Sequence, residues 1–164
     1  MVIIVEDGSI VPNANSYVSE ADMIAYAAAR GVTIASGEAE QFIIVCMDYI
    51  ETRVYQGSQV EFGTQPLVWP RTGVYIEDNL LPSTSIPFQL VNALNQLCIE
   101  LKAGYDALAT VTKDDQVKKE SFAVFAQEYF DNATDVPILR KVNAWLNPLL
   151  DTNPAQGTFV WGYA

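Results

Sequence analysis

The side chains best suited to recognition chemistry lie together in one short segment, residues 65–74. Trp69, Pro70 and Arg71 follow one another there. A tryptophan next to an arginine can stack on an unpaired nucleobase while the guanidinium contacts a phosphate. Such a pair more often forms a packed structural corner, with the arginine bonded to a carboxylate. We favour the structural corner, anchored by Trp69, because one such pair in an acidic chain is weak evidence for nucleic-acid binding.

Catalytic chemistry has little support in the composition. The chain has no histidine, so it lacks the commonest general base and the commonest metal ligand. Its two cysteines, Cys46 and Cys98, fall in apolar helical stretches, where cysteine usually acts as a small buried hydrophobe. Adjacent acids such as Glu77 and Asp78 fit solvated turns, since no calcium-loop spacing follows them. We therefore expect no enzyme, no metal site and no cofactor.

The charge balance argues against general binding to nucleic acid. Nine basic and twenty acidic residues give a net charge of −11, which repels a phosphate backbone. Basic residues are adjacent at only two places, Lys118 with Lys119 and Arg140 with Lys141. No groove that combines basic and aromatic residues is apparent. The acidity fits solubility or a basic partner surface.

The segment at 65–74 is predicted to be an extended, rigid connector. Proline fixes φ and pushes the preceding residue out of the α region, so Pro66 and Pro70 exclude a helix. Apolar residues at helical spacing predict long helices over 38–56 and 87–108, on either side of the connector. These two helices should form the packed centre of the fold.

Further elements complete a mainly α fold. Ser19 is a good N-cap for a helix that runs to Arg30, and Asp135 is a plausible N-cap for a last helix over 136–150. In residues 117–130 the alternation of side chains favours a strand, although the alanines also allow a helix. The β-branched residues at 1–5 predict a short strand. We expect about four helices, a minor β element (a hairpin or short strands) and extended termini.

The chain length fits one domain. We assign residues 1–150 to a single mainly helical domain and residues 151–164 to an extended tail. Phe159, Trp161 and Tyr163 are unusual so near a chain end. They either fold back on their own core or dock on a neighbouring subunit, and we take them as candidate partner contacts. No apolar run reaches the roughly 18 residues of a membrane span. The first residues lack the basic region of a signal peptide, so we expect a role inside a cell.

Several blocks together resemble a family of small tailed-bacteriophage proteins. The specific blocks are Asn-Ala-Asn-Ser-Tyr-Val-Ser at 13–19 and Gln-Pro-Leu-Val-Trp-Pro-Arg-Thr-Gly-Val at 65–74. Ile-Pro at 86–87 and Leu-Asn-Pro-Leu-Leu at 146–150 follow in the same order. Such sequences are often labelled DnaT-like single-stranded-DNA-binding proteins, and they also resemble head-to-tail connector (adaptor, or head-completion) proteins.

The two labels imply different functions. The acidic charge, the lack of a basic–aromatic groove and the aromatic tail favour the adaptor. That resemblance implies a virion structural protein at the head–tail junction, assembled in the host cytoplasm as a homo-oligomeric, dodecameric ring. Its partners would be the portal protein and tail or nozzle proteins, with packaged DNA passing an acidic channel without specific binding. The alternative is a replication-type single-stranded-DNA-binding protein.

Overall fold

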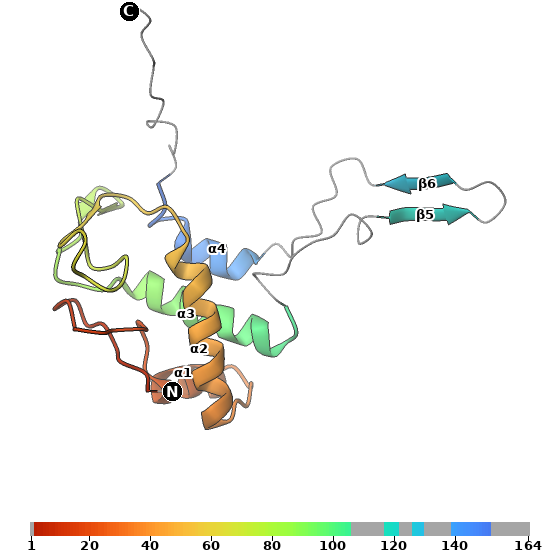
Figure 1. Cartoon of the computed structure of the whole chain (residues 1–164), viewed down its shortest axis with the longest axis horizontal. Helices are drawn as coiled ribbons and strands as arrows, with labels where there is room; N and C mark the ends of the chain where they lie inside the picture. Colours follow the sequence, from red (N-terminus) through yellow and green to blue (C-terminus); the bar gives the residue numbers. More distant parts are fainter. Residues whose placement is uncertain (1, 106–116, 122–125, 130–138, 152–164) are drawn as a thin grey trace, which may run out of the picture.

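The protein is mainly α-helical, as its sequence predicts. The computed structural model describes residues 2–105, 117–121, 126–129 and 139–151. Within these ranges four helices are present, and they pack into one body (Figure 1). The helices are α1 (Glu20–Ala28), α2 (Ser36–Glu51), α3 (Phe88–Lys102) and α4 (Arg140–Leu146).

The strands of the described residues are short and pair antiparallel in twos. The pairs are β1 (Ser58–Gln59) with β2 (Arg71–Thr72), β3 (Tyr75–Ile76) with β4 (Asn79–Leu80), and β5 (Val117–Ser121) with β6 (Ala126–Tyr129). The last pair shows that the described parts of residues 117–130 are strand, as favoured, but they form two paired strands instead of one, with Val117 opposite Tyr129 and Ser121 opposite Ala126.

Helix α1 begins where the sequence predicts. The Ser19 hydroxyl accepts a hydrogen bond from the backbone N–H of Asp22 at 3.1 Å, which satisfies one free donor of the first turn. The helix ends at Ala28, before the predicted Arg30. Gly31 follows with a φ of +75°, a left-handed conformation that favours glycine and lets the chain leave the helix.

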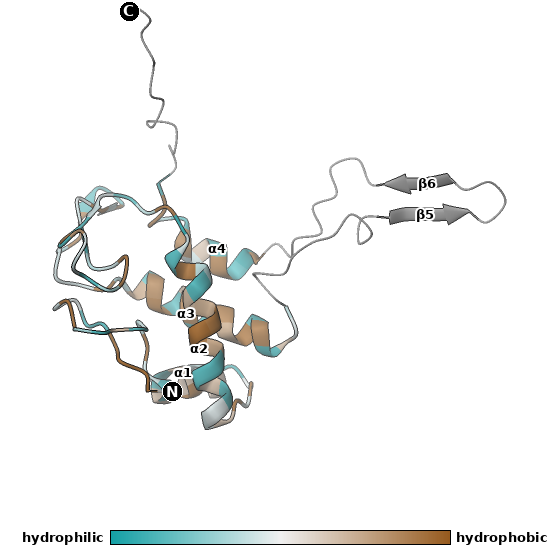
Figure 2. Ribbon diagram, in the orientation of Figure 1, coloured by the Kyte–Doolittle hydropathy of each residue, from teal (hydrophilic) through white to brown (hydrophobic). Residues whose placement is uncertain are grey.

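The helix α3 forms the centre of the body, because it packs against each of the other three helices. Its fully buried side chains include Leu90 and Leu94, and Ile43 and Ile50 of α2 face the same core. Figure 2 shows the apolar stretches of α2 and α3 at the middle of the body. The prediction of two central helices is confirmed, although both are shorter than expected and Pro87 is the N-cap of α3.

Helix α4 is shorter than the sequence pattern indicates. It begins at Arg140 with Leu139 as N-cap, and it ends at Leu146. The predicted cap, Asp135, lies outside the described residues. Val142 and Leu146 are fully buried, and α4 packs against α3.

The predicted strand at residues 1–5 is wrong. Val5 makes one isolated parallel bridge, with Ser16. The next residue, Glu6, is buried, and its carboxylate accepts hydrogen bonds from the backbone N–H groups of Gly8, Ile10 and Val11 at 2.8–2.9 Å. These bonds fold the chain into a compact loop, so no strand continues.

The predicted tail at 151–164, with Phe159, Trp161 and Tyr163, lies outside the described residues except for its first residue. The domain assignment therefore stays a prediction. In the described part of the chain, no helix is long and apolar enough to cross a bilayer.

Candidate functional site

Trp69, the anchor of the predicted corner, is fully buried. Its ring meets Tyr55 edge-on at a centroid distance of 5.6 Å, and the Trp69–Pro70 peptide bond is cis. The backbone N–H of Trp69 donates to the Tyr17 hydroxyl at 3.1 Å. The indole therefore offers no free face to a nucleobase. The role of Trp69, Pro70 and Arg71 as a structural corner stays a prediction.

Arg71 is bonded differently from our expectation. Its guanidinium donates to main-chain carbonyl oxygens, at 2.7 Å to both Gln56 and Gly57, instead of to a carboxylate. Further bonds run to the carbonyls of Tyr55 and Val68. Burial lowers the pKa of Arg71, and the nearby charge of Glu51 opposes that shift. The guanidinium is used to hold the chain after α2, so it is not free to contact a phosphate.

Glu51 links this segment to the start of the chain. Its carboxylate accepts from the Tyr17 hydroxyl at 2.5 Å and from the Val68 backbone N–H at 2.8 Å. Burial raises the pKa of Glu51, and these two hydrogen bonds act in the opposite direction. Burial also raises the pKa of Tyr17, which keeps its hydroxyl protonated as the donor. The network is structural and faces inward.

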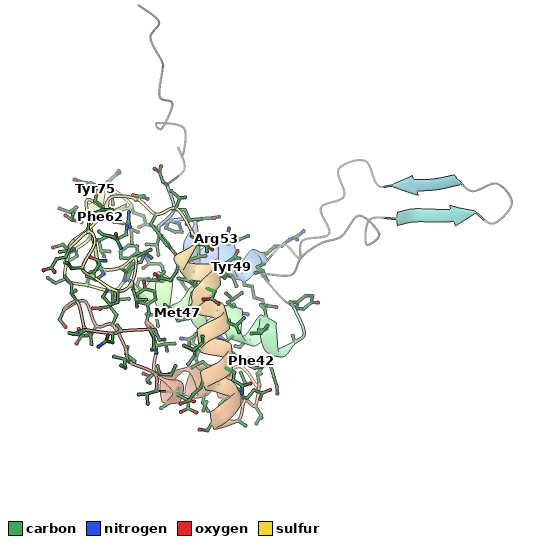
Figure 3. All side chains as sticks on the ribbon, viewed as in Figure 1. Phe42, Met47, Tyr49, Arg53, Phe62 and Tyr75 are labelled. Atoms are coloured by element: carbon green, nitrogen blue, oxygen red, sulfur yellow. The ribbon has the colours of Figure 1, made fainter. Side chains whose placement is uncertain are left out.

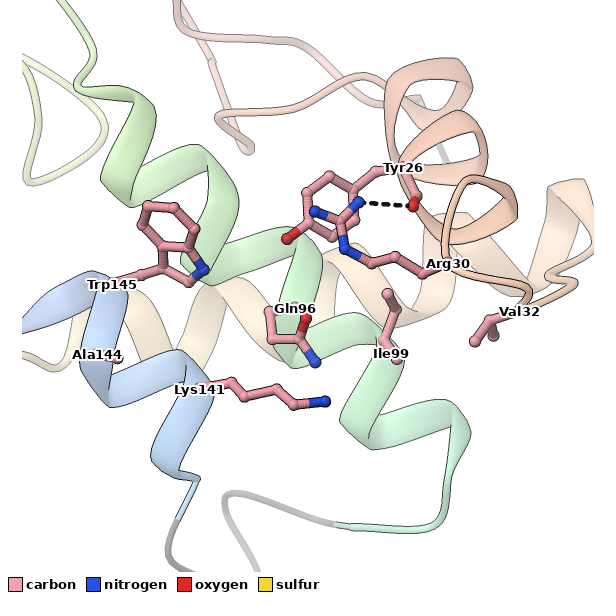
Figure 4. Close-up of a pocket in the computed structure, with 8 residues that line it drawn as sticks. All are labelled: Tyr26, Arg30, Val32, Gln96, Ile99, Lys141, Ala144 and Trp145. Carbon is pink, nitrogen blue, oxygen red and sulfur yellow. Dashed lines mark hydrogen bonds between the residues drawn. The ribbon is translucent and has the colours of Figure 1, made fainter.

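An open pocket of about 590 Å³ lies elsewhere, where α1, α3 and α4 meet (Figure 4). Its wall combines aromatic, basic and small apolar side chains. The lining residues are Tyr26, Arg30, Val32, Gln96, Ile99, Lys141, Ala144 and Trp145. Three segments that are distant in sequence thus contribute to one surface.

On the α1 side, Arg30 lies flat over the ring of Tyr26. The guanidinium carbon is 3.3 Å from the ring centroid, and one guanidinium nitrogen donates to the Tyr26 carbonyl oxygen at 3.1 Å. Burial raises the pKa of Tyr26, and the charge of Arg30 opposes this. Arg30 itself is exposed, so the stacking holds a cation at the rim of the pocket.

The α4 side repeats this combination of cation and aromatic ring. Lys141 is exposed and Trp145 is half-buried, with their side chains directed toward the pocket in Figure 4. The indole meets the ring of Phe88 edge-on at 6.1 Å, which fixes its orientation. Phe88 is 63% exposed, so the aromatic surface continues past the pocket.

Gln96 of α3 supplies the inner wall. It is only 5% exposed, and its Nε2 donates to Glu100 Oε1 at 2.7 Å. The eight lining residues include two cations and no carboxylate. Flat aromatic faces with nearby cations suit nucleotides, because bases stack on the rings and phosphates attract the cations.

A second stack of an arginine on a tyrosine, at the end of α2, differs from the pocket because its ring is buried. The guanidinium carbon of Arg53 lies 3.7 Å from the centroid of the Tyr49 ring. Figure 3 labels both residues near the end of α2. Tyr49 is only 6% exposed, so the ring has no face to offer. Within the part of the chain that the structure describes, no three His, Cys, Asp or Glu side chains form a potential metal site.

This pocket was not predicted from the sequence, and the expectation that no basic–aromatic groove exists is wrong. A signal was present. Tyr26 and Arg30, and likewise Lys141 and Trp145, are spaced i and i+4, which places each pair on one face of a helix. What the sequence could not show is that α3 brings the two pairs together.

Comparison with protein families gives one match. The model of the family described as "Putative DnaT-like ssDNA binding protein" matches residues 1–161. No curated protein and no solved structure matches the chain.

This match overturns the adaptor interpretation. The expected virion role, the portal and tail partners, the ring and the passage of DNA without specific binding all point away from the family that the chain matches. The interpretation relied on the net charge of the whole chain, on the lack of a basic–aromatic groove and on the aromatic tail. The net charge does not reveal the two cations at the pocket. The match covers nearly the whole sequence, and the chain belongs to the family of DnaT-like ssDNA-binding proteins.

Proposed function

We propose that this protein binds single-stranded DNA in the pocket between α1, α3 and α4. The observation that carries the proposal is the meeting of Trp145 and Tyr26 with Arg30 and Lys141 in one open pocket that no carboxylate lines. Membership of a DnaT-like ssDNA-binding family supports the same function.

Each side chain has a distinct part in this binding. Trp145 is the stacking surface, because its half-buried indole lines the pocket while Phe88 packs against it edge-on. Stacking of a base on an aromatic ring contributes about 1–3 kcal/mol. Arg30 and Lys141 contact phosphates, and Tyr26 keeps the Arg30 guanidinium in place. Stacking needs an unpaired base, so single strands are preferred over duplexes.

The affinity should be modest. Two phosphate contacts give a slope of about −1.4 for log K against log salt on single strands. The remaining charge of the chain is strongly negative and opposes approach of DNA. We expect a dissociation constant of roughly 10⁻⁴–10⁻⁶ M at physiological salt, the range of sequence-independent binding.

The test is a fluorescence-anisotropy titration of a labelled thymine oligonucleotide over a series of salt concentrations. Lys141→Ala should weaken binding and make the salt slope less steep by about 0.7. Lys102→Ala is the matched control, because it removes the same charge from α3 outside the pocket, where Lys102 pairs with Glu38 at 2.6 Å. The control should leave the slope unchanged.

A second comparison isolates the stacking. Trp145→Leu keeps an apolar side chain against the core and removes the aromatic face, so single-strand affinity should fall at every salt concentration with the slope retained. Unlabelled duplex should compete poorly with the wild-type complex. Absence of binding at low salt, or equal losses for Lys141→Ala and Lys102→Ala, would overturn the proposal.

The role that we propose is non-catalytic. The sequence has no histidine to act as a general base. The lining residues of the pocket supply stacking surfaces and cations, which are binding groups. Prolonged incubation with labelled oligonucleotide should therefore return the DNA unchanged on a denaturing gel, and cleaved or modified DNA would contradict this.

A further inference from the structure

Gln96 is a buried polar side chain whose amide nitrogen is hydrogen-bonded and whose amide oxygen, among the described residues, is not. Its Nε2 donates to Glu100 Oε1 at 2.7 Å. A carboxylate can only accept, so this bond fixes which end of the amide faces Glu100. Within the described part of the chain, no hydrogen bond ends on Gln96 Oε1. The pocket wall therefore presents a fixed, unpaired acceptor.

The other polar groups that line the pocket are mainly donors. The side chains of Arg30 and Lys141 only donate, and so does the indole N–H of Trp145. In Figure 4 the Lys141 amine ends near the amide nitrogen of Gln96, and the amide oxygen points to the opposite side, toward Tyr26. Among the lining residues, Gln96 is the one with a fixed acceptor.

The bases differ in how well they match this pattern. Thymine presents a donor, N3–H, between two carbonyl acceptors. Cytosine has an acceptor at N3, which would face Gln96 Oε1 without a hydrogen bond. An acceptor that is desolvated on binding without gaining a hydrogen bond lowers the affinity, because its desolvation is not compensated. The pocket therefore complements thymine and penalises cytosine.

We infer that Gln96 makes the pocket prefer thymine over cytosine in single-stranded DNA, with its Oε1 accepting from thymine N3–H. This inference rests on the proposed function and names the base that the same pocket prefers. Glu100 is a positioning residue, because it acts only by holding the Gln96 amide.

The first experiment compares labelled thymine and cytosine oligonucleotides of equal length by anisotropy. We expect the thymine strand to bind about tenfold more tightly. A strand of N3-methylthymine keeps the ring and the carbonyls but loses the donor, so it should bind as weakly as the cytosine strand.

Two variants test whether Gln96 is the residue that causes the preference for thymine. Gln96→Met has a similar length and no hydrogen-bonding group, so it should bring the affinity ratio of the two strands close to one. Glu100→Gln leaves the pocket wall intact but releases the Gln96 amide, which can then turn either end toward the base. Loss of the negative charge should strengthen binding to both strands, while their ratio falls.

The outcomes separate the two proposals. If the wild type binds neither strand, both proposals are overturned. If it binds both strands equally, or if neither variant lowers the ratio, thymine selection by Gln96 is overturned and the binding of single-stranded DNA stands. Because Glu100→Gln leaves the pocket wall unchanged, the test holds even if Gln96→Met fails to fold.

Discussion

Tyr17 connects three parts of the chain through one hydroxyl group. It lies in the segment before α1, donates to Glu51 of α2 at 2.5 Å, and accepts from the backbone N–H of Trp69 at 3.1 Å. The side chain is 3% exposed, so water cannot replace either partner. A hydroxyl used in both directions in a buried network is expensive to remove, because two groups then lose their partner.

Tyr17→Phe should therefore destabilise the protein by about 1–3 kcal/mol, because the half-buried Glu51 carboxylate and the buried N–H of Trp69 both lose a partner. The free energy of unfolding in urea measures the effect. Tyr75→Phe removes the same hydroxyl from a side chain that is 53% exposed, and it should change stability by less than about 0.5 kcal/mol. Equal effects of the two changes would contradict the network.

The Glu51 carboxylate predicts a specific pH dependence. Burial raises its pKa in the folded protein above the ordinary value of 4.5. The folded state then holds the proton more tightly than the unfolded state. The contribution to stability is greatest below about 4.5 and is lost as pH rises through the folded-state pKa. Relative to Glu51→Gln, the wild type should gain free energy of unfolding from neutral pH down to about 4.5. A flat or opposite trend would contradict the raised pKa.

At the scale of elements, the short β1–β2 pair depends on a close backbone approach. Gly57 has a φ of +65°, and a Cβ there would lie 2.0 Å from the carbonyl oxygen of Thr72. The same glycine accepts a hydrogen bond from Arg71. Both the left-handed conformation and the lack of space exclude a side chain at residue 57. Glycine at this position therefore allows β1 and β2 to approach closely.

Gly57→Ala should destabilise the protein by about 1–3 kcal/mol, since the backbone must move or remain strained. Gly37→Ala is the control, because Gly37 lies in the first turn of α2 with no atom within 4 Å of an added Cβ. Alanine at that helical position should be neutral or stabilise by up to about 1 kcal/mol. Urea unfolding of both variants distinguishes the two cases.

Most of the elements could be predicted from sequence, because periodicity and caps are local signals. Ser19 marks the start of α1, and the apolar spacing marks α2 and α3. The strand predicted at 1–5 failed because the carboxylate of Glu6 gathers backbone N–H groups that no pattern reveals. The pocket was missed for a similar reason. Gln96 belongs to a stretch of α3 that looks like core in the sequence, and the other side chains of the pocket come mostly from other helices.

At the scale of the whole molecule, the net charge and the local charge lead to different conclusions. The total of −11 includes acids spread over the entire chain. Salt screens charges beyond about 8–10 Å at physiological ionic strength, so a bound phosphate responds mainly to its nearest neighbours. The charged residues that line the pocket are Arg30 and Lys141, and the carboxylate of Glu100 lies behind Gln96. A summed charge excludes a broad basic surface, but it does not exclude a site for one or two nucleotides.

The meeting of α1 and α4 on α3 has a thermodynamic consequence. The pocket combines side chains from near both ends of the described sequence, so the unfolded chain contains no such site. A ligand that binds only the folded state stabilises it, by about 2.7 kcal/mol at a hundred times the dissociation constant. The thermal unfolding midpoint should rise with the concentration of thymine oligonucleotide, and Lys141→Ala should need more of it for the same rise. A bound oligonucleotide would thus hold α1 and α4 against α3 and slow or reduce unfolding of the chain.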